Sequence, residues 1–409
     1  METKLHETPK DLNPFCWDNK MAEAVYATDQ KYLRYNQELK GWKIRKDSKF
    51  HFNDLGIKSP VYLKNEIKYY NNKRVGMAIF GLGRIGVIHL ENVVKNPRMK
   101  LLYCMDPCQE RCNFVQHRWN LCSESMVTCM ENVDKIFQDP NVDCVVVCTP
   151  TRTHEELVLR SLNAGKAVFC EKPIAPTYEG IKRCYELAEK IKKPLFCAFN
   201  REFDSGFKYI KEHAKKELGQ IQVIKTCSRD SPLPSVSYLK TSGGIFHDCA
   251  VHDIDIICWI LEEFPTSVIV QAHAFIPEIK EMGDYDTVGI MMKFESGAIA
   301  CIDLSRFSCY GYDQRLEVFG PKGMFNSGDL RPTPITNYSA NGSTSVPIFY
   351  SFASRYQEAY FNEMEHLADV MQGICELRVS GKRTLAVSKI ASACEESAKT
   401  GKIVELNWH

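Results

Sequence analysis

Two residues of the chain have types and a spacing suited to proton transfer. Asp248 and His252 are four positions apart, so on a helix they would share one face and could touch. A carboxylate beside an imidazole fixes the tautomer of the ring and stabilises its protonated form, which makes the histidine a competent general base near neutral pH. A helix-cap carboxylate next to a satisfied core histidine is the alternative interpretation.

A lysine at the end of an apolar run could complement such a base. Lys172 follows the run Ala167–Cys170 and precedes Pro173, which restricts the chain. A cation held there could bind a reacting hydroxyl or carbonyl oxygen and favour alkoxide character. With a base to remove the O–H proton, this chemistry fits the oxidation of an alcohol by hydride loss. A surface lysine at a strand end is the alternative.

A glycine-rich run predicts a binding site for a dinucleotide, which would be the hydride acceptor. Gly81, Gly83 and Gly86 form G-x-G-x-x-G directly after the apolar run Val75–Phe80, and Asp106 lies about 20 residues further on. The three glycines would allow a sharp turn, a close approach to a pyrophosphate and tight packing of helix on strand, respectively. The phosphates would rest on free backbone N–H groups at a helix N-terminus.

Asp106 indicates which dinucleotide the site should bind. Asp106 would accept hydrogen bonds from ribose hydroxyls and repel a 2′-phosphate, so the sequence predicts NAD rather than NADP. Arg111 is not adjacent to the acid and is not expected to clamp a 2′-phosphate. The carboxyl ends of parallel strands should complete the cofactor crevice. The predicted cofactor-binding residues are Gly81, Gly83, Arg84, Ile85, Gly86, Asp106, Thr149, Pro150, Thr151, His154, Glu171 and Lys172.

The elements that must position these residues differ between two parts of the chain. Continuous apolar strands alternate with helical patterns from 75 to 197, which predicts a doubly wound parallel sheet, a Rossmann domain. After about residue 200, longer alternating strands follow one another, which predicts an α+β domain with a large open antiparallel sheet. The segment 336–346 is predicted to be an exposed loop. The expected divisions are 1–74, 75–198 and 199–409.

The segment 1–74 is an N-terminal extension rich in aromatic residues, so we expect it to pack on the body of the protein or on a neighbouring subunit. The alternative is that this basic, aromatic segment binds RNA.

Composition excludes several classes of protein. The net charge is +1, so charge gives no broad attraction to nucleic acid or membranes. No apolar run approaches about 18 residues, and the start has no apolar signal region, so we expect a cytoplasmic protein without a membrane span. The 18 cysteines include no C-x-x-C pair; we expect reduced packing thiols and no metal.

Taken together, these motifs resemble one family of enzymes. The motifs are the glycine-rich run with His89 behind it, Thr149-Pro150-Thr151 with His154, the string A-G-K-A-V-F-C-E-K-P at 164–173, and G-G-I-F-x-D-x-x-x-H-D at 243–253. They resemble the glucose–fructose oxidoreductase / inositol dehydrogenase / rhizopine-catabolism family over residues 75 to 409. The resemblance implies that Lys172, Asp248 and His252 act on the hydroxyl that is oxidised.

Within that family, the inositol dehydrogenases are the most similar subgroup. The resemblance is carried by segments around residues 200–204, 228–244, 310–313 and 355–360. It implies oxidation of a cyclitol or sugar hydroxyl with NAD, myo-inositol to its 2-keto product being the leading reaction, and a homo-oligomer, by resemblance a tetramer. Another sugar, cyclitol or dihydrodiol dehydrogenase and a non-catalytic NAD-dependent sensor are the alternatives. The implied substrate contacts are Asn200, Arg201, Asp230, Asp255 and Tyr312, and Glu202 stands where the subgroup has a second arginine.

Overall fold

The computed structural model describes residues 73–127, 133–328 and 330–408, which belong to one compact unit. The predicted extension, 1–74, lies outside the described residues except for its last two positions. Our expectations for that segment therefore stay predictions.

The first half is built on a six-stranded sheet whose paired strands are all parallel. The strand order, β3-β2-β1-β4-β5-β6, places β1 at the centre, where the chain order reverses. The parallel pairing and this strand order confirm the doubly wound parallel sheet predicted for residues 75–197. The strands are β1 (Val75–Phe80), β2 (Met99–Met105), β3 (Met126–Val127), β4 (Cys144–Val147), β5 (Ala167–Cys170) and β6 (Leu195–Cys197).

Helices connect these strands and cover the sheet, which explains why the strands are almost entirely apolar. Every residue of β1, β4 and β5 is buried, as expected for strands that are covered on both faces. The helix after β1 packs so close to the preceding turn that a Cβ on Gly86 would lie 1.9 Å from the carbonyl oxygen of Gly81. The helices are α3 (Arg84–Lys95), α4 (Gln109–Trp119), α5 (Asp134–Gln138), α6 (His154–Asn163) and α7 (Tyr178–Ile191).

The second half contains a seven-stranded sheet that is mostly antiparallel, in the order β12-β11-β7-β10-β9-β8-β15. One pair, β7 and β10, is parallel. The chain leaves β7 through helices and re-enters the sheet at β8 in the same direction, and the antiparallel steps from β8 to β9 and from β9 to β10 restore that direction in β10. The strands are β7 (Val223–Arg229), β8 (Pro265–His273), β9 (Thr287–Phe294), β10 (Ile299–Ser305), β11 (Asp313–Gly320), β12 (Gly323–Ser327) and β15 (Val404–Glu405).

Two features of this half differ from the sequence prediction. The segment predicted as an exposed loop is exposed, but it forms a hairpin of β13 (Thr336–Ser339) and β14 (Gly342–Ser345). The helix α8 (Ser205–Leu218) was not predicted, although Asp204 caps its N-terminus by accepting hydrogen bonds from two backbone N–H groups.

The remaining helices include the one that carries the predicted base. It begins with a π-helical turn, Phe246–Ala250, and continues as α10 (Val251–Leu261). The others are α9 (Val236–Leu239), α11 (Pro277–Glu281), α12 (Phe352–Arg355), α13 (Gln357–Met371) and α14 (Gly381–Thr400).

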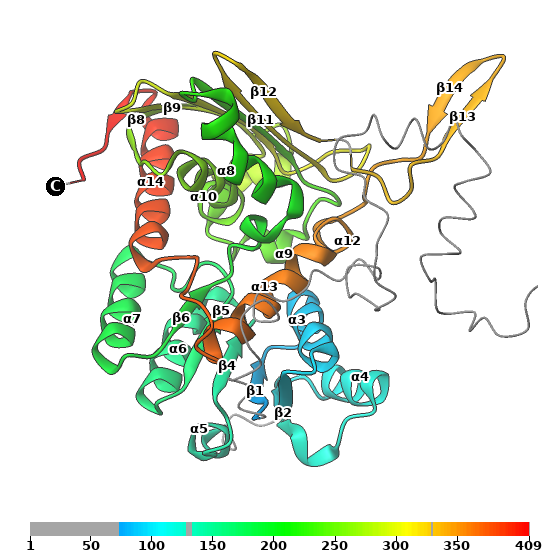
Figure 1. The fold of residues 1–409 in the computed structure, drawn as a ribbon, viewed down its shortest axis with the longest axis vertical. Helices are drawn as coiled ribbons and strands as arrows, with labels where there is room; N and C mark the ends of the chain where they lie inside the picture. Colours follow the sequence, from blue (N-terminus) through cyan, green and yellow to red (C-terminus); the bar gives the residue numbers. More distant parts are fainter. Residues whose placement is uncertain (1–72, 128–132, 329, 409) are drawn as a thin grey trace, which may run out of the picture. The chain divides into compact units, whose positions relative to one another are not determined.

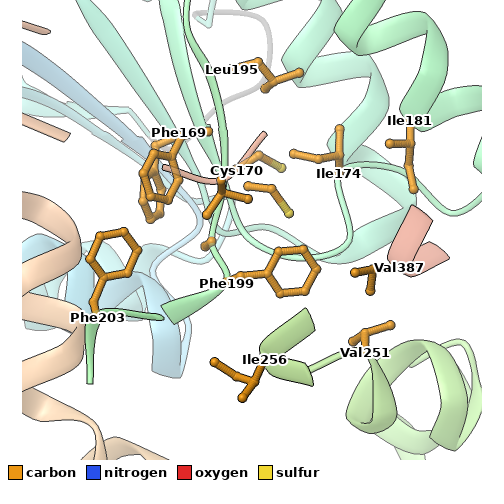
Figure 2. Packing of buried hydrophobic residues seen from close by; sticks show 14 of the residues in the cluster. Phe169, Cys170, Ile174, Ile181, Leu195, Phe199, Phe203, Val251, Ile256 and Val387 are labelled. Atoms are coloured by element: carbon orange, nitrogen blue, oxygen red, sulfur yellow. The ribbon is translucent and has the colours of Figure 1, made fainter. Parts of the chain in front are cut away.

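Helices α8, α10 and α14 pack on one face of the second sheet, and α13 returns to the first half, where it packs against α3 (Figure 1). The apolar core runs continuously between the halves. Figure 2 shows Phe169 and Cys170 of β5 near Phe199, Ile256 of α10 and Val387 of α14. The ends of β1, β4 and β5 are thereby held beside the N-terminal part of the α10 helix.

Candidate active site

A single cavity of about 760 Å³ brings together residues from both halves of the molecule. This volume lies within the range typical of ligand sites, roughly 300–1,000 Å³. Of the residues predicted from the sequence, all but Gly86 and Asp255 line it. They are Gly81, Gly83, Arg84, Ile85, Asp106, Thr149, Pro150, Thr151, His154, Glu171, Lys172, Asn200, Arg201, Asp230, Asp248, His252 and Tyr312.

Among the residues that line the cavity, Lys172 and Asp248 form an ion pair between the two halves. The Lys172 Nζ lies 3.0 Å from Asp248 Oδ1 and donates to the Asp248 carbonyl oxygen at 2.5 Å. Burial lowers the pKa of the Lys172 ammonium, but the Asp248 carboxylate and other neighbours raise it by more, so the pKa lies above its ordinary value. Lys172 is therefore a cation at neutral pH.

The carboxylate of Asp248 has two further partners that the sequence analysis did not assign. Tyr238 donates its hydroxyl to Oδ1 at 2.8 Å, and Arg306 donates Nη1 to Oδ2 at 3.0 Å. Burial raises the pKa of Asp248, but the charges of Lys172 and Arg306 outweigh that effect and the pKa lies below its usual range. Asp248 is thus an ionised carboxylate with donors on both oxygens.

His252 lines the same cavity but does not hydrogen-bond Asp248, which corrects the expected contact. The backbone at Phe246–Ala250 is π-helical, and both oxygens of the Asp248 carboxylate are already bound by Lys172, Tyr238 and Arg306. The Nδ1 of His252 is buried without a hydrogen-bond partner among the described residues. Burial, followed by the positive charges of Lys172 and Arg201, lowers the pKa of His252 well below its ordinary value. Its ring is neutral at neutral pH and can accept a proton.

The other end of the cavity fits a dinucleotide. The N-terminus of α3 has no side-chain cap and no acidic residue in its first turn, so its backbone N–H groups are available to an anion. A Cβ added to Gly83 would meet nothing within 4 Å, so the backbone there faces open space. Gly81 has a φ of +91°, which glycine adopts without strain.

Asp106 lies at this end, held by backbone groups. Its Oδ2 accepts from Leu82 N at 2.8 Å and its Oδ1 accepts from Cys108 N at 2.9 Å. Although Arg111 is not adjacent in sequence, its Nη1 lies 3.4 Å from Asp106 Oδ2 and it also lines the cavity. An arginine is therefore within reach of the Asp106 carboxylate, and the expectation that Arg111 does not clamp a 2′-phosphate stays a prediction.

Two histidines hold the loops that follow β4 and β5. His154 bridges them, because its two ring nitrogens lie 2.7 Å from the carbonyl oxygens of Thr149 and Pro173. The Nε2 of His89 lies 2.7 Å from Glu171 Oε1. The His154 contact holds the backbone after Lys172, and the His89 contact holds the side chain before it, so His154 supports the site structurally in addition to lining it.

The substrate end is rich in polar groups. Arg201 donates from Nη1 to Ser228 Oγ at 3.1 Å and to Asp253 Oδ1 at 3.0 Å. Asp230 accepts from Ser231 N at 2.8 Å. Burial raises the pKa of the Asp230 carboxyl to about 6, and the nearby Asp248 charge adds to that shift. Tyr312 lies near Arg201 on the same cavity.

Asp255, a predicted substrate contact, lies outside the cavity. Its Oδ1 accepts from Arg383 Nε at 3.0 Å, and the same guanidinium pairs with the fully buried Glu202. Burial and the Asp255 charge raise the pKa of Glu202 above its usual range. Glu202, which stands where the subgroup has an arginine, is therefore part of a buried cluster around Arg383.

Within the part of the chain that the structure describes, no group of three or more His, Cys, Asp or Glu residues could hold a metal ion. The 16 cysteines in those ranges are all free thiols. None of the helices described is long and apolar enough to cross a membrane.

Comparison with known proteins identifies relatives of the same architecture. Residues 75–199 match the model for an oxidoreductase family with an NAD-binding Rossmann fold, and residues 208–326 match the C-terminal domain of that family. The chain is 35% identical to the inositol 2-dehydrogenase of Rhizobium meliloti over 79% of this chain and 96% of that protein.

Solved structures agree with these matches. A myo-inositol dehydrogenase from Corynebacterium glutamicum has a TM-score of 0.76 and 32% identity, covering 82% of this chain and 100% of that one. A scyllo-inositol dehydrogenase from Lactobacillus casei, solved with NAD(H) and scyllo-inositol, has a TM-score of 0.75 and 25% identity, covering 81% and 99%. The chain belongs to the Gfo/Idh/MocA family of oxidoreductases, which combine an NAD-binding Rossmann domain with a C-terminal sheet domain.

Proposed function

We propose that the protein oxidises a secondary hydroxyl of a cyclitol with NAD, and that myo-inositol, converted to its 2-keto product, is the leading substrate. The observation that carries this proposal is the ion pair of Lys172 with Asp248, beside His252, in a cavity that also contains the dinucleotide end. The relatives described above are named inositol dehydrogenases, which supports a cyclitol over other alcohols.

The residues present suit NAD, which when bound would accept a hydride from the substrate carbon. The glycine-rich turn and the N-terminus of α3 would hold its phosphates, and Asp106 would hold its ribose. The remaining chemistry, the removal of the hydroxyl proton, falls to side chains of this chain.

His252 is the proposed proton acceptor. Its lowered pKa keeps the ring neutral, so it has a lone pair available over the whole neutral pH range. Lys172 is the proposed oxyanion partner, because its ammonium is held as a cation and lines the cavity. As the O–H proton moves to His252 and the C–H hydride leaves, the developing negative charge on oxygen would lie beside the Lys172 ammonium.

The polar groups at the substrate end support a hydroxyl-rich ligand. Each buried hydroxyl needs a hydrogen-bond partner, and Asn200, Arg201, Asp230 and Tyr312 offer amide, guanidinium, carboxylate and phenol groups on one cavity. We propose these four as substrate-binding residues. Asp255 is not retained among them.

The test is a screen of polyols with NAD, monitored by NADH absorbance, using myo-inositol, scyllo-inositol, pyranoses and a dihydrodiol. Turnover is expected with inositols and is expected to fall sharply in Lys172→Met. NAD binding without NADH formation from any polyol would overturn the proposal and favour a non-catalytic sensor.

We further propose that the protein is a cytoplasmic homo-oligomer, with a tetramer as the leading state. The free thiols support a reducing compartment. The uncovered side of the second sheet carries exposed apolar residues, which supports subunit contact there. These residues are Met291, Ile299, Phe319 and Met324. Light scattering of the purified protein measures its mass, and a monomer would contradict the oligomer.

A further inference from the structure

Arg306 is a completely buried arginine that the reaction proposed above does not use. It follows β10, and its side chain has 0% exposure. One terminal nitrogen, Nη1, donates to Asp248 Oδ2 at 3.0 Å, and the other, Nη2, donates to Asp284 Oδ2 at 3.2 Å. Burying a guanidinium is costly, so both carboxylates are needed to hold it as a cation.

Asp284 is itself fixed to the start of the π-helical turn. Its Oδ1 accepts from the backbone N–H of Ile245 at 3.1 Å. The same carboxylate oxygen lies 3.3 Å from the place of a Cβ on Gly244, a residue with a φ of +82°. Asp284 therefore connects the guanidinium of Arg306 to the backbone immediately before the turn that carries Asp248.

We propose that Arg306 is a positioning residue for Asp248, and that Asp284 anchors it: the guanidinium holds Oδ2 so that Oδ1 stays directed to Lys172 and Tyr238. This inference rests on the proposed function, because it matters to catalysis only if Lys172 acts on the substrate oxygen. The two donors on Oδ1, at 3.0 and 2.8 Å, come from different elements and need a carboxylate that does not rotate.

The charges around Asp248 make the role of Arg306 electrostatic as well as geometric. Two cations, Lys172 and Arg306, face the carboxylate, and Asp284 offsets the second of them. The other titratable groups close to Asp248 are Tyr238, Cys249, Asp230 and the cavity-lining His252. Removing the Arg306 charge makes the net charge around Asp248 more negative, whereas removing the Asp284 charge makes it more positive.

The test compares Arg306→Gln, Arg306→Lys and Asp284→Asn in the full chain with NAD and the best polyol from the screen. Arg306→Gln is expected to lower kcat by about 10²-fold, the cost of misplacing a catalytic group by about 1 Å. Its pH profile of kcat should move to higher pH, because the remaining negative charges favour protonation of Lys172 and His252. Arg306→Lys keeps the charge, so the profile should stay in place while kcat falls less.

Asp284→Asn should move the profile in the opposite direction, to lower pH, because a negative charge is lost. A matched control is Arg98→Gln, which removes another largely buried arginine, paired with Glu365 and Asp369. That control should lower the melting temperature without moving the profile. Unshifted profiles in both Arg306→Gln and Asp284→Asn, or equal losses of NAD affinity and kcat, would overturn the positioning role.

A readout without turnover separates this inference from the proposed function. Acetylation of Lys172 by acetic anhydride, followed by mass spectrometry across pH, reports the protonation of that amine in the absence of substrate. Only the unprotonated amine reacts, so at a fixed pH the acetylation rate of Lys172 should fall in Arg306→Gln and rise in Asp284→Asn. If no polyol is oxidised but these changes in rate occur, the proposed function fails and the electrostatic coupling stands. Equal acetylation rates in all variants overturn the coupling whatever the polyol screen shows.

Discussion

The Lys172 ammonium contacts Asp248 twice, at the Oδ1 atom and at the backbone carbonyl oxygen. Lys172 follows β5 of the first sheet, and Asp248 belongs to the turn that leads into α10 beside the second sheet. Because both contacts join the two halves, the Lys172 ammonium of the first half is held by the side chain and the backbone of Asp248 in the second half.

Replacing Lys172 by Met should lower kcat by roughly 10²–10³, the range for loss of one donor to a developing oxyanion. Lys190→Met, at an exposed position of α7, is the matched control and should leave kcat unchanged. Steady-state rates with saturating NAD and polyol measure the effect. A Lys172→Met enzyme as fast as the control would exclude the oxyanion role.

His252→Ala should lower kcat by roughly 10²–10⁴, as expected for the loss of a positioned acid–base group. NAD affinity should barely change, because the residue lies at the substrate end of the cavity, and NADH fluorescence titration checks this. His213→Ala on α8, whose ring stacks on Tyr209 away from the cavity, serves as the control. Full turnover of His252→Ala across pH 6–10 would remove the assignment.

Asp230→Asn should stabilise the protein at pH 7 while weakening polyol binding. The pKa of Asp230 in the folded state, about 6, lies above the ordinary value of a carboxyl group. Ionisation of Asp230 therefore destabilises the folded state, and it does so fully at pH values above about 6. The gain in melting temperature should shrink as pH falls through about 6 and vanish below the ordinary pKa of a carboxyl. Thermal unfolding at several pH values measures it, and KM should rise. A stabilisation that is independent of pH would contradict the argument.

Asp106 should make NAD at least tenfold better than NADP in kcat/KM, because a carboxylate facing a 2′-phosphate costs more than about 1.4 kcal/mol. Asp106→Ser should narrow the gap by releasing Arg111, which lies 3.4 Å from the carboxylate, to bind the phosphate. The double variant Asp106→Ser with Arg111→Ala should lose that gain. Equal use of both cofactors by the wild type would refute the role of Asp106.

Arg383→Met should destabilise the fold by roughly 3–5 kcal/mol, because it leaves two buried carboxyl groups, Glu202 and Asp255, without their cation. Adding Glu202→Gln should recover part of the loss, since one charge fewer is then unpaired. Urea unfolding monitored by tryptophan fluorescence gives both values. If the single variant unfolds at the wild-type urea concentration, the cluster does not hold the fold.

The parts of the site that could be predicted from the sequence are those set by local structure. Gly81, Gly83 and Asp106 follow strands at fixed distances, and Lys172 follows a strand directly, so their positions depend on few long-range contacts. The helix that carries Asp248 and His252 was also predicted, but its first turn is π-helical, which no spacing rule for α-helices anticipates.

The parts that could not be predicted depend on residues far apart in the chain. Arg306 and Asp248 are 58 positions apart in the chain, and the sequence around neither residue indicates that the two form a pair. Asp255 was assigned to the substrate only because the family resemblance implied it. Its partner, Arg383, is 128 positions away, and only the packing of α14 beside α10 brings them together.

The π-helical turn at Phe246–Ala250 also limits which changes in chain length this region can tolerate. Each helical residue turns the chain, by about 100° in an α-helix, so deleting Cys249 or Ala250 would rotate Asp248 about the helix axis relative to α10. The apolar side of α10 is locked in the core, so the helix could not rotate to compensate. Single-residue deletions here should therefore abolish the site while leaving the sheet intact. In an alignment of related sequences, insertions and deletions should be rarer in this stretch than in the exposed hairpin of β13 and β14.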